Sequence, residues 1–252
     1  MATRYLLLWL EAPLQSWGHD SKFGRRDTLN FPTKSGVMGL VCCALGQGGQ
    51  QREFLAQFAP LKQTVFSFVR KNHKAEKRDR EPLLRDFHMV GSGYKKGALS
   101  KKNPNYDPWE SLLIPMTWDS KTRKTDIATD KGGLRSGVKM TYRYYLQDAF
   151  FAVVLETPSD LADSIAQALQ APFWDLCLGR KSCVPTDLVY RGVFDSEEDA
   201  IACAKRIAED KNLLEDFHVF DGQHDGEALT LNDVPLQFGE RKLYRDRRVT
   251  VI

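Results

Sequence analysis

Residues 31–40, with the sequence Phe-Pro-Thr-Lys-Ser-Gly-Val-Met-Gly-Leu, combine residue types suited to binding a phosphate group. A proline turn leads into two hydroxyl side chains and a lysine, and the apolar spacing that follows is typical of a helix. The first N–H groups of a helix lack partners within the helix and carry partial positive charge, so they attract phosphate. The stretch is not a P-loop, because the order G-x-x-x-x-G-K-S/T is missing. Close packing of the helix on a sheet explains Gly36 and Gly39 equally well.

A second basic glycine turn lies far downstream, at residues 178–183 (Leu-Gly-Arg-Lys-Ser-Cys). Its cations and backbone N–H groups also suit phosphates, and aromatic side chains elsewhere could stack on unpaired bases, each stack being worth about 1–3 kcal/mol. The candidate phosphate contacts are Lys34, Arg135, Lys139, Arg180 and Lys181. The candidate stacking residues are Trp17, Tyr94, Tyr142 and Tyr144. A place in the hydrophobic core is the alternative for Trp17 and for one of the pair Tyr142 and Tyr144.

Charge is unevenly spread along the chain, although the formal net charge is only +3. Residues 70–102 carry eleven lysines and arginines against four acidic residues, whereas residues 195–227 carry eleven acidic residues against three basic ones. The last twelve residues are again basic. This asymmetry favours one surface that faces a polyanion and another that faces solvent or protein. Ordinary solvated loops are the alternative explanation.

The histidines are the candidates for acid–base chemistry. A metal-independent ribonuclease needs a base to activate a 2′-hydroxyl group and an acid for the leaving oxygen. His88, together with Tyr94, Lys95 or Lys96, could supply both, and His73 lies in a lysine-rich loop. No spacing forces either assignment, and a histidine in a basic loop is equally expected as an RNA contact or as a solvated side chain.

A metal site is not expected from the spacing of the possible ligands. His218, Asp221, His224 and Asp225 are close in sequence, but they form neither an H-E-x-x-H motif nor an EF-hand. The chain contains no C-x-x-C pair. We therefore expect no metal and no cofactor.

Length and composition are those of a soluble globular protein. At 252 residues the chain can bury one large core or two small ones. No apolar run approaches the roughly 20 residues that span a bilayer. The odd number of cysteines, five, argues against a disulfide framework. We expect a reduced, cytoplasmic protein.

Periodicity and end signals predict the elements that must position these residues. Strands are expected at 4–11, 64–70, 85–90, 142–156 and 188–194, and helices at 35–45, 51–58, from Ser159 to about Leu169, and from Ser196 to about residue 210. Thr33 or Ser35 is the expected N-cap of the first helix. The order strand, helix, strand, insertion, strand, helix, strand predicts a ferredoxin-like α+β core from residues 1–70 and 141–212. A long polar insertion occupies 71–140, and a small β region of short strands occupies 213–252.

Several motifs, in order along nearly the whole chain, are similar to those of one family. They are Ala12-Pro13-Leu14-Gln15-Ser16-Trp17-Gly18, Phe31-Pro32-Thr33-Lys34-Ser35-Gly36, Leu84-Arg85-Asp86-Phe87-His88, Tyr145-Leu146-Gln147-Asp148-Ala149-Phe150, Leu178-Gly179-Arg180-Lys181-Ser182-Cys183 and Pro235-Leu236-Gln237-Phe238. The chain resembles the Cas-five family of CRISPR-associated proteins, and within it the members found in type I-E Cascade complexes. The resemblance implies an RRM-like, ferredoxin-type fold of the RAMP superfamily, in which residues 71–140 would be the thumb insertion.

The resemblance also implies a function in antiviral defence. Such a subunit holds the 5′ handle of the CRISPR RNA at one end of the complex, beside the backbone subunit of CasC type and the large subunit of CasA type, and reaches target DNA through the complex. We accordingly expect a non-catalytic RNA-binding scaffold in a ribonucleoprotein. Two alternatives stay open: an endoribonuclease that processes precursor CRISPR RNA in the repeat, and a scaffold that contacts proteins only.

The RNA-binding residues we predict lie at the two glycine turns, in the loop after the first strand, and in or beside the insertion. They are Trp17, Arg25, Arg26, Lys34, Ser35, Gly36, Arg85, His88, Arg135, Lys139, Tyr142, Arg143, Gly179, Arg180, Lys181 and Ser182. We expect the two glycine turns to face the same RNA, and the acidic helix at 196–210 to lie away from it.

Overall fold

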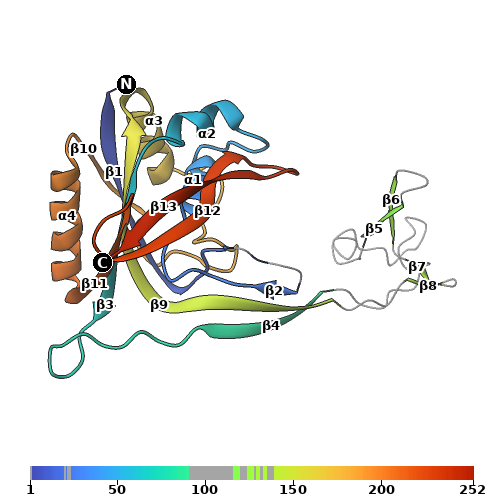
Figure 1. Ribbon diagram of the computed structural model, residues 1–252, viewed down its shortest axis with the longest axis horizontal. Coiled ribbons are helices and arrows are strands. Elements are labelled where there is room, and N and C mark those ends of the chain that lie inside the picture. Colours follow the sequence, from blue (N-terminus) through green and yellow to red (C-terminus); the bar gives the residue numbers. More distant parts are fainter. Residues whose placement is uncertain are drawn as a thin grey trace. The chain divides into compact units, whose positions relative to one another are not determined.

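The computed structural model of the chain describes residues 2–19, 21, 24–90, 116–119, 124–127, 129–130, 133–134 and 139–252 (Figure 1). The chain divides into a larger unit, Met1–Ser21, Asp27–Leu84 and Tyr144–Ile252, and a smaller unit, Lys22–Arg26 and Arg85–Arg143. Within the described ranges, every helix is too short or too polar to cross a membrane.

The larger unit is built on an antiparallel sheet with the strand order β10-β1-β9-β3-β11-β13-β12. Its strands are β1 (Thr3–Gln15), β3 (Gln63–Arg70), β9 (Lys139–Pro158, which begins in the smaller unit), β10 (Tyr190–Phe194), β11 (Leu213–Asp221), β12 (Glu227–Gln237) and β13 (Leu243–Val251). Its helices are α1 (Lys34–Ala44), α2 (Arg52–Phe58), α3 (Ser159–Gln170) and α4 (Glu197–Asp210). The expectation of mixed helices and strands in an α+β protein is confirmed.

Helices cover both faces of this sheet. Successive side chains of a strand point to opposite faces, and in β1 Leu6 and Leu8 pack in a core with α1, α2 and α3. Leu7 and Trp9 pack on the other face, against Ala200 and its neighbours on α4. Figure 1 shows α4 on the side of the sheet away from α1, α2 and α3. The run of apolar residues in β1 is therefore buried on both sides.

The helix ends follow the sequence signals. Thr33 is the N-cap of α1, and its Oγ1 accepts a hydrogen bond from the N–H of Gly36 at 3.2 Å. Ser196 caps α4 in the same way, with its Oγ accepting from the N–H of Asp199 at 3.1 Å. Acidic residues in the first turn of α4 add to its stability because they interact favourably with the helix dipole.

The strands after residue 212 are longer than the short strands expected from the sequence, and they continue the main sheet. β11 pairs with β3, from Leu213 opposite Arg70 to Val219 opposite Val65. β12 and β13 then form an antiparallel hairpin, and β13 pairs with β11. Hairpin β12–β13 is thereby brought beside the helices of the first core, α1 and α2, in the same unit.

The smaller unit contains the beginning of β9 and two strands that pair with it. β2 (Arg25–Arg26) runs parallel to β9 opposite Tyr142 and Arg143. β4 (Leu84–Val90) also pairs with β9. Two further hairpins are formed by β5 (Met116–Asp119) with β6 (Lys124–Ile127), and by β7 (Thr129–Asp130) with β8 (Gly133–Leu134).

Candidate nucleic-acid interface

Two segments of the larger unit that are distant in sequence, the end of β1 and the turn at Gly179, are in direct backbone contact. The N–H of Ser16, just after β1, donates to the carbonyl of Leu178 at 3.1 Å. Gly179 has φ +94°, and a Cβ atom there would lie 1.7 Å from the carbonyl oxygen of Ser16. Only glycine fits this position, because a side chain would need both an unfavourable backbone conformation and space that the Ser16 carbonyl already fills.

A second glycine brings the start of α1 to the same place. A Cβ atom on Gly36 would lie 2.8 Å from the ring of Trp17, so the absence of a side chain lets the indole pack directly on the first turn of the helix. The indole N–H donates to Oε1 of Gln15 at 3.1 Å, and the amide of Gln15 donates to the carbonyl of Ala149 at 2.7 Å. The end of β1, the start of α1 and the 178–183 turn therefore form one interlocked cluster.

These segments surround an open groove with a volume of about 480 Å³. Its lining residues come from the end of β1, from α1, from the glycine turn and from hairpin β12–β13: Ser16, Trp17, Gly18, Thr33, Ser35, Gly36, Gly39, Leu40, Cys43, Cys177, Gly179, Phe238, Lys242 and Tyr244. Hereafter we call it the central groove. The structure brings Ser35, Gly36 and Gly179 of the two predicted turns to this one groove.

Hairpin β12–β13 supplies a wall that sequence reasoning missed. Phe238, Lys242 and Tyr244 line the central groove. Lys242 and Tyr244 also line a polar extension of it, together with His19 and Asn232. The basic composition of the last twelve residues was a signal for this wall, but it could not say which face of the hairpin meets α1.

Lys34 is buried, so it does not offer its ammonium group to a ligand at the surface. Its side chain is enclosed, with the residue 1% exposed, and its Nζ donates to the carbonyl of Leu61. Burial lowers the pKa of Lys34 to about 8, and the nearby Asp221 and Asp233 carboxylates only partly oppose this effect. We therefore assign Lys34 to the interior, in place of the phosphate contact expected from the sequence.

Trp17 is likewise part of the core. Its residue exposure is 1%, and it packs with Val37 and Phe31 among the buried apolar residues. The core alternative considered for this residue is the one that the structure supports, because no ring face is open for a base. Tyr145, beside the pair Tyr142 and Tyr144, is buried as well.

The tip of the glycine turn is exposed, whereas the residues on either side of it are buried or partly buried. The N–H of Cys183 donates to the carbonyl of Arg180 at 2.8 Å, which closes a tight turn. The guanidinium carbon of Arg180 lies 4.6 Å from the centre of the Tyr145 ring, and that side chain is partly buried. Lys181 and Ser182 are exposed at the tip. Lys181 is therefore the cation of this turn best placed to meet a phosphate.

An apolar depression adjoins the central groove, sharing Cys43 and Cys177 with it. It is lined largely by the loops on either side of the glycine turn, including Trp174, Val184 and Leu188. Leu188 is 73% exposed and Val184 62% exposed. Burial raises the pKa of the Cys43 and Cys177 thiols, so both are neutral hydrophobic side chains near neutral pH.

The remaining described RNA-binding candidates lie in the smaller unit. Arg25 and Arg26 are exposed on β2, which runs beside Tyr142 and Arg143 on β9. The guanidinium carbon of Arg85 lies 5.7 Å from the centre of the Tyr142 ring.

Three further candidates, His88, Lys139 and Arg135, come from this part of the chain. His88 is exposed and lies 3.7 Å from Asp86. Lys139 is the first residue of β9, and Arg135 lies outside the described residues, as do Tyr94, Lys95 and Lys96.

The histidines considered for chemistry are dispersed. His73 is exposed in the loop after β3, in the larger unit, whereas His88 belongs to the smaller unit. His218 contacts Glu215 at 2.8 Å, and Nε2 of His224 contacts the carbonyl of Asp221 at 3.2 Å. Among the described residues, no three His, Cys, Asp or Glu side chains gather in a geometry that could hold a metal ion.

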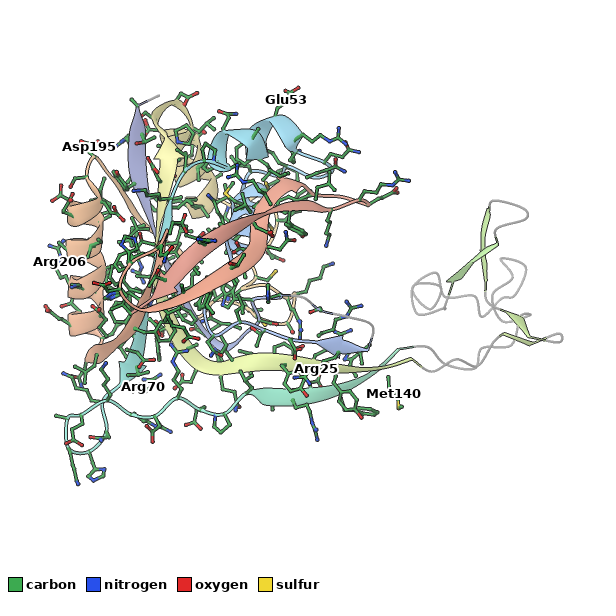
Figure 2. The ribbon with its side chains drawn as sticks, viewed as in Figure 1. Arg25, Glu53, Arg70, Met140, Asp195 and Arg206 are labelled. Atoms are coloured by element: carbon green, nitrogen blue, oxygen red, sulfur yellow. The ribbon has the colours of Figure 1, made fainter. Side chains whose placement is uncertain are left out.

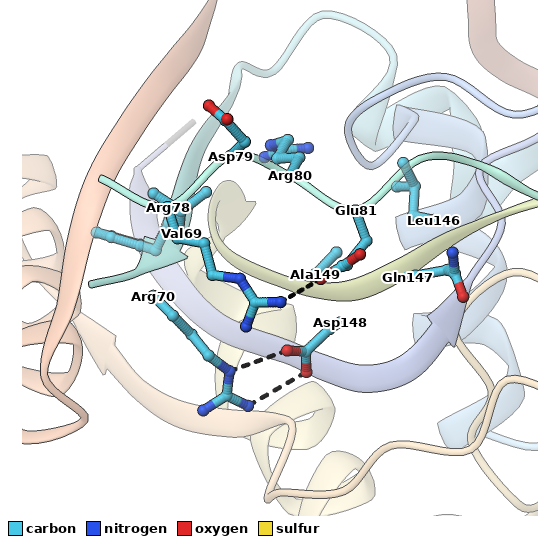
Figure 3. Close-up of a pocket in the computed structure, with 11 residues that line it drawn as sticks. Val69, Arg70, Arg78, Asp79, Arg80, Glu81, Leu146, Gln147, Asp148 and Ala149 are labelled. Carbon is cyan, nitrogen blue, oxygen red and sulfur yellow. Dashed lines mark hydrogen bonds and ion pairs between the residues drawn. The ribbon is translucent and has the colours of Figure 1, made fainter. Parts of the chain in front are cut away.

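A cluster of arginines forms a second charged surface in the larger unit (Figure 3). Arg70 makes two hydrogen bonds to Asp148, at 2.9 and 3.2 Å, and Arg78 pairs with Glu81. Arg80 is covered by the ring of Phe217, 4.7 Å from its guanidinium carbon. Each of these arginines is engaged within the chain, so this surface is less suited to a ligand than the central groove.

The sheet and its two helical layers define an α+β protein with an open groove that is lined by α1, the Gly179 turn and hairpin β12–β13. The profile of the CRISPR-associated protein family Cas5 matches residues 5–250. The chain therefore belongs to the Cas5 family of CRISPR-associated proteins.

Individual relatives agree with this assignment. The chain is 29% identical over 200 residues to the CRISPR system Cascade subunit CasD of Escherichia coli strain K12, covering 77% of this chain and 73% of that protein. A chain of a CRISPR RNA-guided surveillance complex is similar with a TM-score of 0.62 and 28% identity, over 98% of this chain and 89% of that one. A crystal structure of a Cas protein is similar with a TM-score of 0.55 and 25% identity, over 98% and 93%.

Proposed function

We propose that this protein is a non-catalytic subunit of a type I-E Cascade complex that binds the 5′ handle of the CRISPR RNA in the central groove. The observation that carries the proposal is the meeting of the α1 start and the Gly179 turn in one groove. The similarity to CasD and to a chain of an RNA-guided surveillance complex supports the same function. By this role the protein caps one end of the complex and supports guide-directed binding of foreign DNA in antiviral defence.

The strand order supports a ferredoxin-like description of the core. Strands β1, β3, β9 and β10, with α1 and α3 between them, follow the βαββαβ order along the chain. In the sheet they lie as β10-β1-β9-β3, all antiparallel. We propose that residues 71–140 are the thumb inserted into this core, and that the neighbours are backbone and large subunits of the CasC and CasA types.

Lys181 and Lys242 are the exposed cations that we propose to meet RNA phosphates, since Lys242 lines the central groove and Lys181 the depression beside it. The test purifies the complex through a tag on this chain and sequences the bound RNA and its ends. We expect short RNAs that share one repeat-derived 5′ end. The double variant Lys181→Glu and Lys242→Glu should lose most of this RNA. Recovery of undiminished RNA with that variant would refute the groove as the site.

The matched control is Arg206→Glu, which makes the same change of charge on α4. Arg206 is exposed (Figure 2), and α4 covers the sheet face opposite to α1. This variant should retain normal amounts of RNA. An equal loss of RNA in the control would show that net charge, and not the groove, determines retention.

The ribonuclease alternative is tested with the same purification. In the double variant His73→Ala and His88→Ala, RNA of unchanged length and ends supports the scaffold function. Accumulation of uncut precursor would instead assign the protein to the endoribonucleases. A protein-only scaffold would yield no enriched RNA with any variant.

A further inference from the structure

Asp233 occupies an irregular position in β12, where its side chain turns inward. The pairing of β12 with β13 shifts between Asn232, opposite Asp246, and Val234, opposite Arg245. Asp233 is the extra residue of this β-bulge, and bulges re-aim a side chain away from the regular alternation. The residue is 2% exposed, so its carboxylate must find its partners inside the protein.

The Asp233 carboxylate joins helix α1 to the hairpin. Its Oδ2 accepts a hydrogen bond from the backbone N–H of Lys34 at 2.8 Å, which is one of the unpartnered N–H groups at the helix start. The same carboxylate accepts two hydrogen bonds from the Arg247 guanidinium group, one from Nε at 2.7 Å and one from Nη2 at 2.9 Å. Arg247, on β13, also pairs with Asp221 on β11. Two strands and the helix therefore meet at one buried carboxylate.

The other contacts of the hairpin hold it to different elements. Arg52 on α2 donates to the side chain of Gln237, and the N–H of Phe238 donates to the carbonyl of Gln50 at 3.0 Å. Arg245 donates to the carbonyl of Ala59 at 2.7 Å, just after α2. These contacts fix the hairpin against α2. The Asp233 contact is the one that ties it to the first residue of α1, where Ser35 and Gly36 line the central groove.

We propose that Asp233 is a positioning residue for RNA binding: it fixes the wall of the central groove that carries Lys242 and Tyr244 relative to the start of α1. This inference rests on the proposed function of the groove. Asp233 touches no RNA itself. It acts through Lys242. The bulge at Asp233 holds the hairpin in place, and the position of the hairpin sets the distance between Lys242 and Ser35 across the groove.

The test is a double-mutant cycle on the full-length chain. Its probe is a labelled single-stranded RNA with the repeat-derived 5′ end of the RNA that copurifies with the complex. Asp233→Asn retains the shape of the side chain but removes its charge. We expect it to weaken RNA binding about tenfold, which corresponds to about 1.4 kcal/mol. In a Lys242→Gln background the same change should weaken binding less than about twofold, because residues that act through one another are not additive.

Three controls separate positioning from unfolding and from loss of the proposed function. Asp225→Asn makes the same chemical change at an exposed turn and should bind like the wild type. All binding is measured below the thermal transition of every variant. If Asp233→Asn fails to fold, the double-mutant cycle uses Arg247→Lys instead. This variant keeps the positive charge but loses the planar guanidinium group that binds the Asp233 carboxylate.

The outcomes are distinguishable. Equal weakening by Asp233→Asn in both backgrounds, or no weakening in the wild-type background, overturns the positioning role while leaving RNA binding intact. Normal binding by Lys242→Gln overturns the proposal that Asp233 acts through Lys242. Failure of the wild-type chain to bind this RNA overturns the proposed function and, with it, the inference.

Discussion

Gly179 and Ser16 are in contact through their backbones, and no side chain at position 179 is compatible with that contact. A Cβ atom at Gly179 would stand 1.7 Å from the Ser16 carbonyl oxygen. At Gly39, which also lines the groove, nothing lies within 4 Å of the corresponding position. Two glycines in the same groove therefore differ in what they do. Gly179 lets two distant segments join, and Gly39 leaves open space.

This contrast predicts opposite effects for one chemical change. Gly179→Ala should lower the free energy of unfolding by about 1–3 kcal/mol or more, because it combines overpacking with a strained backbone. Gly39→Ala should leave stability unchanged or raise it by up to about 1 kcal/mol, since alanine is the better residue inside a helix. Thermal unfolding of the two variants measures the difference. Equal melting temperatures would contradict the close approach at Gly179.

The buried Lys34 predicts a pH dependence of stability above neutrality. Its pKa falls from the ordinary 10.5 to about 8 on folding, so between these values the unfolded chain binds more protons than the folded chain. Stability should therefore rise with pH in that window, by up to about 3 kcal/mol from this group. Denaturant unfolding from pH 7 to pH 10.5 measures the rise. Lys34→Met should remove it, while Lys74→Met, at an exposed lysine, should not.

Binding of RNA phosphates predicts a steep dependence of affinity on salt. If about five phosphates are neutralised, the logarithm of the association constant should fall against the logarithm of salt concentration with a slope of roughly −3.5. Lys181→Gln and Lys242→Gln should each reduce the magnitude of this slope by about 0.7. Arg206→Gln on α4 should leave it unchanged. An affinity that does not depend on salt would contradict phosphate recognition.

The Arg70–Asp148 pair predicts a small effect at acid pH (Figure 3). The hydrogen bond from Arg70 lowers the pKa of Asp148 below its ordinary 3.8. Its stabilisation is therefore present above that pH and is lost as pH falls through the folded-state value. Both side chains are about half exposed, so Asp148→Asn should cost at most about 1 kcal/mol at pH 7.

Asp148 has a left-handed backbone conformation, with φ +46°, which asparagine also tolerates. The Asp148→Asn variant therefore removes the charge without straining the backbone. Urea unfolding at pH 7 and pH 3 measures it, and the difference between wild type and variant should shrink at pH 3. Asp79→Asn, in the same cluster, is the control and should show no such difference. A loss that persists unchanged at pH 3 would assign the effect to packing.

The sequence predicted most helices and strands because their signals are local. The cap at Thr33, the amphipathic pattern of α3 and the aromatic run of β9 each identify an element without reference to the rest of the chain. The arrangement of the strands after residue 212 was harder to predict. Whether the strands after residue 212 stand apart or extend the sheet depends on the pairing of β11 with β3, and no local signal specifies a partner strand so distant in sequence.

The candidate site was also predictable in part, namely where the signal was local in sequence. That Ser35, Gly36 and Gly179 would lie close together was expected from the two basic glycine turns, and they line one groove. Lys34 has the residue type of a phosphate contact, but its environment is set by Asp233 and by the loop carbonyl of Leu61. Such burial comes from tertiary packing, which residue type and spacing do not reveal.

The central groove has a consequence for the order of synthesis. Ser16 and Ser35 emerge from the ribosome long before Lys242 and Tyr244, which line the same groove. Early segments of a chain begin to fold while synthesis continues, yet α1 gains its Asp233 partner only 199 residues after Lys34. The nascent chain thus lacks the finished groove until hairpin β12–β13 has been synthesised, so its ligand cannot meet a complete site before that point.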